Sequence, residues 1–542
     1  MERTLFIDVS TFKDFSVQID KQFRCSAGIW QQADQLIGCE VEQLALAEIY
    51  AEPQLRASQI RLPEILNSFF EYKTKPINLM VRHRLPSSSY YTPAGESEWS
   101  RESFGDQSIA VLPGEYRDPV EMARHVAGHL NDSQQPFFVM DVTAVQQKLE
   151  ALRVICPRIR ATYSVACNGD PVLARILANN EDVNFEVANT TELEMASAHI
   201  EPSRIVLRSQ LLTRKTIRQT TEFGCGTIVI ETEKQLQDVF SSAPLSEILI
   251  AINLQYSNAE IPFGCQIEEF EQLIELAHLI GAKVTGIHLE LGSNSTLSDY
   301  CNMIHDAHNI FELASRKYVD LRKLSFGSFV IPTNNEQDLV MFCSTINRTI
   351  SYYFDEKVDV SANVGCFLVT NAFTLCTNVI GKQQMDAKFI TNDDFDDGVG
   401  FVYQTNDGVY GSFGCRQMNI NPFCKPLDPS LNDEPLHFGT IIGPSLDQID
   451  IAQNLTKCRQ LRVGEWLVWE KMGAFTIPVD SEYPVPPVYY YSRKECWQKL
   501  VEKDEQRRSP SPGFDDIGSD CGDSTSSGDD DSMFGSNMFL NL

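Results

Sequence analysis

Six positions at the ends of short apolar runs are the first candidates for chemistry in this chain. In barrels and open sheets of parallel strands, reactive side chains sit where the strands end. The positions are Ala166, Glu186, Arg208, Glu290, Gly327 and Cys366. None is a lysine, because Lys215 falls inside a predicted helix and Lys283 precedes a strand. Schiff-base chemistry needs an amine at such a site, so the sequence offers no evident one.

The apolar runs alternate with helical patterns. The runs that predict strands are Ala161–Ala166, Val183–Val187, Arg204–Leu207, Thr227–Glu231, Glu247–Ile252, Val284–Glu290, Lys323–Gly327 and Val358–Val364. Helical periodicity lies between them over Asp170–Asn179, Ile267–Ile280 and Leu297–Tyr318. Eight strands alternating with helices over about 230 residues is the size of a (β/α)8 barrel. We therefore predict an α/β fold with such a barrel over residues 140–372.

A second folded part and a tail follow the barrel. After Asn371 the helical patterns stop, and strand-like segments with turn residues follow, among them NDGVYGSF and LRVGEWLVWE. They predict an all-β domain over residues 373–500. Beyond Arg508 there is no Lys or Arg, and seven aspartates lie among Ser and Gly. We predict a disordered acidic tail over residues 501–542, because such a segment buries too little apolar surface to fold.

Composition excludes several classes of protein. The chain has 45 Lys and Arg against 74 Asp and Glu, a net charge of −29, which disfavours binding to nucleic acid or anionic lipid. No run of 18 apolar residues indicates a membrane span, and the N-terminus lacks a signal peptide's apolar core. The 15 cysteines contain no C-x-x-C pair, so we expect no metal site and reduced thiols. Thiols of this kind suit the cytoplasm or the nucleus.

Several segments resemble one enzyme family. Residues 163–168 read Tyr-Ser-Val-Ala-Cys-Asn, which is similar to the Tyr-Ala-Val-Lys-Cys-Asn strand of eukaryotic ornithine decarboxylases. Segments NDGVYGSF (406–413), GEW (464–466), EKMGA (470–474) and AFTL (372–375) resemble the same family's β-domain. The resemblance implies a fold-type III pyridoxal phosphate (PLP) architecture, an alanine-racemase-like barrel inserted in a β-domain. Residues 106–139 are then the first part of the β-domain, and residues 1–105, with a linker near 86–105, stay unassigned.

The resemblance fails where the family's chemistry lies. The lysine that holds PLP falls on Ala166, and the histidine that stacks on its ring falls on Glu290. The family's Glu-Pro-Gly-Arg reads Asn363-Val364-Gly365-Cys366. This change removes the acid that charges the pyridine nitrogen and the arginine that grips the phosphate.

Further family positions are altered in the same way. A phosphate-binding tyrosine falls on Phe475, a substrate-binding aspartate on Asn419, and the cysteine supplied across the dimer on Leu446. The glycine triplet of the phosphate loop reads Gly327-Ser328-Phe329, so we expect bulk to fill that backbone nest. The remnants of the cofactor site are Gly292, Ser293 and Gly327. We expect no bound cofactor and no decarboxylase activity, which makes the chain a pseudoenzyme.

The resemblance also implies a regulatory partner. The family includes antizyme inhibitors, inactive homologues that bind antizyme and so protect ornithine decarboxylase and polyamine synthesis. Antizyme engages the face after the third barrel strand. Here five cations fall within fifteen residues there: Arg204, Arg208, Arg214, Lys215 and Arg218. We expect antizyme to contact Arg214, Lys215 and Arg218.

Three alternatives stay open. The chain could be a decoy subunit that forms mixed dimers with an active ornithine decarboxylase. It could be a polyamine sensor, because Glu186, Glu192, Glu290 and Asp447 would form an acidic ligand site at the barrel mouth. The least favoured alternative is an active ornithine decarboxylase that uses an unaligned amine. The oligomeric state, monomer or dimer, is not settled by the sequence.

Overall fold

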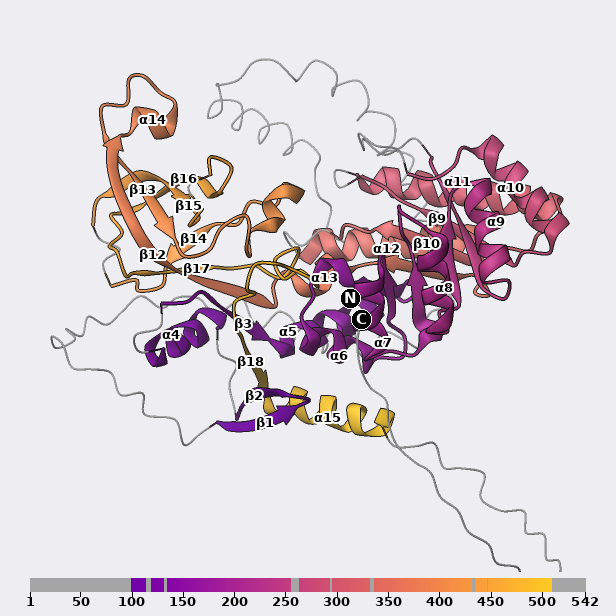
Figure 1. Ribbon diagram of the computed structural model, residues 1–542, viewed down its shortest axis with the longest axis horizontal. Helices are drawn as coiled ribbons and strands as arrows, with labels where there is room; N and C mark the ends of the chain where they lie inside the picture. Colours follow the sequence, from indigo (N-terminus) through magenta and orange to yellow (C-terminus); the bar gives the residue numbers. More distant parts are fainter. Residues whose placement is uncertain are drawn as a thin grey trace, which may run out of the picture. The chain divides into compact units, whose positions relative to one another are not determined.

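The structure is a computed structural model (Figure 1). It describes residues 99–113, 118–130, 134–254, 263–292, 295–331, 336–430, 434–445 and 447–508. The predictions for the region before residue 99 and for the tail after residue 508 lie outside the described residues, as do Ser293 and Leu446. Within the described ranges no helix has the length and apolar content that crossing a bilayer requires.

Eight parallel strands close into a barrel in the order β10-β11-β4-β5-β6-β7-β8-β9. The strands are β4 (Arg160–Ser164), β5 (Asn184–Val187), β6 (Ile205–Leu207), β7 (Thr227–Ile230), β8 (Glu247–Ile252), β9 (Val284–Leu289), β10 (Lys323–Ser328) and β11 (Asp359–Asn363). Each overlaps one of the eight predicted runs, so the predicted barrel is confirmed. The runs are apolar because helices cover the outside while side chains fill the inside.

Helices follow the strands around the barrel. They are α5 (Val142–Ile155), α6 (Pro171–Ala178), α7 (Thr190–Ser197), α8 (Arg214–Glu222), α9 (Glu233–Ser242), α10 (Ile267–Ile280), α11 (Leu297–Arg316), α12 (Glu336–Tyr353) and α13 (Gly365–Val369). Local sequence sets their ends. Asp170 caps α6 by accepting from the Leu173 amide, and Gly281, at φ +79°, ends α10.

The β-domain is a ten-stranded sheet built from both sides of the barrel sequence. Its strands are β1 (Ser100–Phe104), β2 (Gln107–Leu112), β3 (Phe137–Asp141), β12 (Phe373–Asp386), β13 (Val399–Thr405), β14 (Cys424–Pro426), β15 (Leu436–Ile442), β16 (Ile451–Arg459), β17 (Trp466–Trp469) and β18 (Val488–Arg493). Strand β3 pairs with both β12 and β18, so segments before and after the barrel share one sheet. The barrel is therefore inserted in the β-domain, as the resemblance implied.

Two predicted boundaries are wrong. Strand β1 lies within the region predicted to be unassigned, and it pairs with β2 because Gly105, at φ +67°, turns the chain back. Helix α15 (Lys494–Arg508) continues through residues 501–508, which were assigned to the tail. Its buried side is spaced one turn apart at Trp497, Leu500 and Asp504. Charged residues lie between these three positions, so the sequence pattern did not indicate an amphipathic helix.

The β-domain also contains helices α4 (Pro119–His129) and α14 (Lys388–Thr391).

Hydrogen bonds join the β-domain to the start of the barrel. Immediately after β4, the chain forms a 3-10 turn over Val165–Cys167. The Phe475 amide donates to the Cys167 carbonyl at 2.7 Å, and the Gly169 amide donates to the Ile477 carbonyl at 2.7 Å. The Asn168 side chain donates to the Gly473 carbonyl, also at 2.7 Å. These bonds fix the 473–477 segment against the carboxyl end of β4.

Candidate functional site

An ion pair crosses the carboxyl end of the barrel. Arg208, which follows β6, donates to the carboxylate of Glu290, which follows β9. The Arg208 guanidinium also lies over the Phe263 ring, 4.4 Å from its centroid, and Ser328 donates to Glu290 at 3.3 Å. Both charged side chains are about one-fifth exposed. The pair therefore neutralises the position onto which the family's ring-stacking histidine falls.

A buried histidine lies below this ion pair. His288 lies on β9, two residues before Glu290, and both side chains lie on the same side as Gly327. Its Nδ1 lies 3.0 Å from the Ser325 hydroxyl, while Nε2 has no hydrogen-bond partner. Burial, with Arg208 nearby, lowers the pKa of His288 to about 3, so the ring is neutral. A Cβ on Gly327 would lie 3.1 Å from Glu290 and 3.2 Å from His288, so these side chains pack against the bare glycine.

Glu186 is a buried acid in the same region. It lies on β5 and is 6% exposed. Burial raises the pKa of this carboxyl to about 7. The charge of Arg208 opposes the rise, and the charges of Glu290 and Glu192 add to it. Glu186 therefore exchanges its proton near neutral pH, which an exposed glutamate does not do.

The altered family positions around β4 and β11 lie together. These strands are neighbours, with Asn363 paired to Thr162. Ala166 lies in the 3-10 turn after β4, and Cys366 lies in α13 after β11. The sulfurs of Cys167 and Cys366 are 3.9 Å apart, and Phe475 reaches the same turn through its amide bond to Cys167. The structure thus brings Ala166, Asn363, Cys366 and Phe475 to one side of the barrel mouth.

The buried amine in this part of the barrel is already engaged. Lys148, on α5, is 8% exposed and donates to the Phe367 carbonyl of α13 at 2.5 Å. Burial, together with the charge of Lys471, lowers the pKa of Lys148 to about 8. The amine lies 4.9 Å from the Phe367 ring centroid. Lys148 is therefore held on the outside of the barrel by α13, and it supports that helix.

Other predicted site residues have structural contacts elsewhere. Glu192 accepts from the Ala188 amide and the Asn189 side chain, both at 2.7 Å, at the start of α7. Phe329 does not fill the phosphate nest as expected, because it packs beneath α11 and α12, 4.9 Å from the Tyr300 ring and 5.6 Å from the Phe342 ring. Gly292 accepts the Ser295 hydroxyl at 2.6 Å within its own loop.

Asp447 and Asn419 belong to loops of the β-domain. Asp447 lies between β15 and β16, where it accepts the Tyr410 hydroxyl at 2.6 Å. Asn419 is exposed and ends a 3-10 turn at φ +58°. The prediction that Asp447 joins Glu186 in an acidic cluster was made without these contacts. The structure gives Asp447 a different neighbour.

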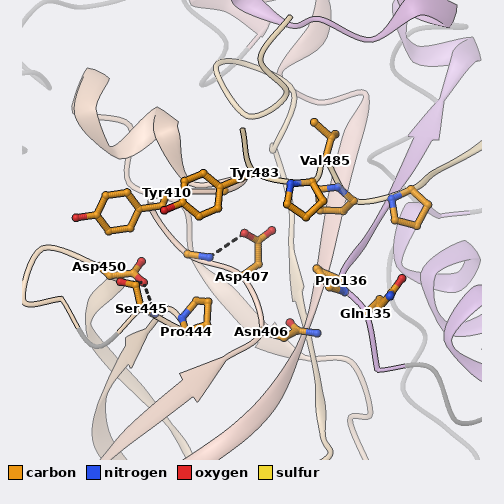
Figure 2. A pocket seen from close by; sticks show the side chains of 15 residues that line it. Gln135, Pro136, Asn406, Asp407, Tyr410, Pro444, Ser445, Asp450, Tyr483 and Val485 are labelled. Carbon is orange, nitrogen blue, oxygen red and sulfur yellow. Dashed lines mark hydrogen bonds between the residues drawn. The ribbon is translucent and has the colours of Figure 1, made fainter. Parts of the chain in front are cut away.

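The loop that contains Tyr410 borders a cavity of about 450 Å³ (Figure 2). The Tyr410 and Tyr483 rings stack there, with centroids 6.1 Å apart. Figure 2 shows Asp407 and Asp450 below these rings in the view. Asp407 accepts from the Ser412 amide at 3.0 Å, and Asp450 accepts from the Val409 amide at 2.7 Å. Both carboxylates therefore hold the loop in shape.

The predicted basic patch is smaller than expected. Arg204 donates to the carbonyls of Ala178, Asn180 and Val183, and Arg208 is in the ion pair at the mouth. The three remaining cations, Arg214, Lys215 and Arg218, are exposed on α8. Arg214 also donates to Asp238 of α9 at 2.6 Å. Exposed apolar residues flank this helix, with Leu211 82% and Phe223 41% exposed.

Comparison with known proteins finds relatives among decarboxylases and antizyme inhibitors. Residues 142–370 match the family described as "Pyridoxal-dependent decarboxylase, pyridoxal binding domain". The chain is 29% identical to antizyme inhibitor 2 of Xenopus laevis over 386 residues, which are 68% of this chain and 84% of that protein. It is 27% identical to ornithine decarboxylase of Caenorhabditis elegans over 416 residues, 74% of this chain and 97% of that protein.

Solved structures support the fold. The arginine decarboxylase of Paramecium bursaria Chlorella virus, bound to agmatine, superposes with a TM-score of 0.63 at 22% identity, and covers 68% of this chain and all of that chain. The lysine/ornithine decarboxylase of Vibrio vulnificus gives 0.60 at 21% identity, with 69% of this chain and 99% of that chain covered. These structures show the fold alone, while the sequence matches show that residues 142–370 are a pyridoxal-dependent decarboxylase barrel and that the chain is similar to ornithine decarboxylases and antizyme inhibitors.

Proposed function

We propose that this chain is a catalytically inactive member of its family that regulates polyamine synthesis by binding antizyme. The observation that carries the proposal is that the barrel mouth, within the described residues, lacks an amine that could bind PLP. Ala166 stands where the family's cofactor lysine falls, and the nearby buried amine, Lys148, is bonded to Phe367. A covalent link to PLP therefore lacks its amine.

The other groups at the mouth do not fit PLP either. Glu290 is paired with Arg208 and packs against Gly327. The pyridine ring of PLP would need a neutral stacking partner at this position. The side-chain oxygen of Asn363 accepts a hydrogen bond from the Gly365 backbone amide at 3.2 Å. The Asn363 side chain also lacks the negative charge that would keep a pyridine nitrogen protonated. Cys366 and Phe475 replace an arginine and a hydroxyl that would bind phosphate. The proposed function therefore does not use PLP.

The surface of α8 supports antizyme as the partner. Arg214, Lys215 and Arg218 give the helix a cluster of exposed cations in a chain of net charge −29. Leu211 and Phe223 add apolar surface at its two ends. A basic surface with apolar contacts suits an acidic partner, since charge speeds association and apolar burial supplies affinity. Antizyme inhibitors among the relatives support the identity of that partner.

The experiment is a rescue assay with an active ornithine decarboxylase silenced by antizyme. Titrating this protein should restore decarboxylation at near-stoichiometric amounts. The variant Arg214→Glu/Lys215→Glu/Arg218→Glu should lose the rescue by at least tenfold in the amount required. A control with the same charge change, Arg322→Glu/Lys357→Glu/Lys494→Glu, should rescue like the parent, because those cations are exposed on other parts of the chain.

The alternative partner is ornithine decarboxylase itself, which also stands among the relatives. Size-exclusion chromatography of the two proteins without antizyme separates the alternatives. A 1:1 complex with reduced decarboxylase activity would support a decoy subunit. Failure to rescue, together with separate elution, would reject both partners.

A further inference from the structure

Two cysteines face each other at the barrel mouth. Cys167 ends the 3-10 turn after β4, and Cys366 lies in the first turn of α13 after β11. Their sulfurs are 3.9 Å apart. A disulfide needs about 2.05 Å between sulfurs, so a movement of roughly 2 Å would join them. The two residues are 199 positions apart in sequence, and the closure of the barrel brings them together.

The two cysteines differ in exposure and in acidity. Cys366 is exposed, whereas Cys167 is 2% exposed. A hydrogen bond from the Cys167 thiol lowers the pKa of Cys366, and the same bond, with burial, raises the pKa of Cys167. Cys366 is thus both the more exposed and the more acidic of the two thiols. This arrangement places an accessible thiol of lowered pKa beside a buried one that could resolve its oxidised form.

A second close pair lacks this access. Cys156 and Cys343 also form a side-chain hydrogen bond, but both are fully buried. All other cysteines in the described ranges are buried or half-buried. The short distance between the sulfurs therefore does not distinguish the Cys167–Cys366 pair from the Cys156–Cys343 pair. The solvent exposure of Cys366 distinguishes them.

We propose that Cys167 and Cys366 are a redox modification site that a hydroperoxide converts to a disulfide. The Cys366 thiolate attacks the outer oxygen of the hydroperoxide, forming an S–O bond while the O–O bond breaks. The leaving alkoxide takes a proton and departs as the alcohol, or as water from hydrogen peroxide. The Cys167 sulfur then attacks the Cys366 sulfenic acid, the S–S bond forms, and hydroxide leaves as water with the Cys167 proton. The two sulfurs together lose two electrons, which the hydroperoxide gains.

The disulfide would tie together the ends of two barrel strands. β4 and β11 are neighbours, and the turn after β4 also holds the 473–477 segment of the β-domain through Cys167 and Phe475. A cross-link that closes a loop of this length restricts the unfolded chain strongly. We expect oxidation to raise Tm by roughly 5 °C, and a thiol reductant should reverse the rise.

The test is a thiol map of the full-length protein. The protein is treated with hydrogen peroxide, denatured, alkylated with N-ethylmaleimide, digested and analysed by mass spectrometry. The expected result is a disulfide-linked peptide pair containing Cys167 and Cys366, with the Cys156 and Cys343 peptides still alkylated. In Cys167→Ser, Cys366 should stop at the sulfenic acid and react with dimedone at least tenfold more than in the parent.

The control is Cys301→Ser, which removes a half-buried thiol from α11 and should still form the linked pair. Should Cys366 remain alkylated in the parent after peroxide, or take up dimedone equally with and without Cys167, the proposal is overturned. The same holds if Cys156 and Cys343 are oxidised as readily. Neither readout involves antizyme, so the outcome is independent of the proposed function.

Discussion

Glu186 should make the stability of the barrel depend on pH in a direction unusual for a carboxylate. Its pKa is about 7 in the folded chain, against an ordinary value of 4.5 for a glutamate in solvent. Between these values the folded state holds a proton that the unfolded state releases. The free energy of unfolding therefore falls as pH rises from 4.5 to 7. This sign is opposite to that of a carboxylate in a salt bridge, whose pKa is lowered.

The magnitude follows from the shift. About 2.5 pKa units at 1.36 kcal/mol each give about 3 kcal/mol over the whole range, of which about 2.5 kcal/mol falls between pH 5 and pH 8. Glu186→Gln keeps the shape and removes the titration. The difference in unfolding free energy between Glu186→Gln and the parent should therefore rise by about 2.5 kcal/mol from pH 5 to pH 8. Contributions of all other groups are common to both proteins.

The assay is urea unfolding of parent and variant at four pH values from 5 to 8, followed by circular dichroism. Glu201→Gln serves as the control, because it makes the same change of side chain at an exposed position near the same strands. A flat difference for Glu186→Gln would refute the reasoning. It would mean that Arg208 keeps Glu186 ionised despite its burial.

Three further predictions concern other parts of the chain. Asp504→Asn should lower stability by about 3 kcal/mol in urea, because it leaves Arg175, bonded at 2.5 Å and 8% exposed, as an unpaired buried charge; Glu502→Gln on the exposed side of α15 should cost little. Asp450→Ala should speed hydrogen exchange of the Val409 and Ser445 amides at least tenfold, since it removes their acceptor, and Asp447→Ala should not. Ala166→Lys should retain no visible absorbance from PLP after dialysis and show no decarboxylation, because the other cofactor contacts are also missing; a retained absorbance band would contradict the fit argued above.

The sequence predicted the barrel strands well because their signal is local. Each strand is a short apolar run set off by turn residues, and the closed barrel buries both of its faces. Helix α15 was missed for the opposite reason. Its buried stripe consists of Trp497, Leu500 and Asp504, and a buried aspartate is recognisable only once Arg175 is known to face it. A partner more than 300 residues away leaves no trace in a local pattern.

The site was predicted in part. Strand ends gave Glu186, Arg208 and Glu290, but their charges were treated separately, and the ion pair between Arg208 and Glu290 depends on the barrel's closure across 82 residues. His288 was missed, although its spacing of two from Glu290 on a predicted strand was a usable signal. Asp447 was assigned to the mouth because it stands beside Leu446, onto which the family's cysteine falls. Its bond to Tyr410 depends on a β-domain loop that the sequence does not position.

The charges at the mouth help to choose between a sensor and a docking protein. A polyamine carries at least two positive charges and needs acidic groups that are ionised and free. Here the charge of Glu290 is cancelled by Arg208, the carboxylate of Glu192 is used by the start of α7, and Glu186 is only half ionised near pH 7. Such a mouth offers few carboxylates that are both ionised and free, and a dication that paired with Glu290 would leave Arg208 without its partner. Lys215 and Arg218 of α8 are exposed, so acidic groups of a partner can pair with them without breaking the Arg208–Glu290 ion pair. This difference favours a function on the outer surface of the barrel.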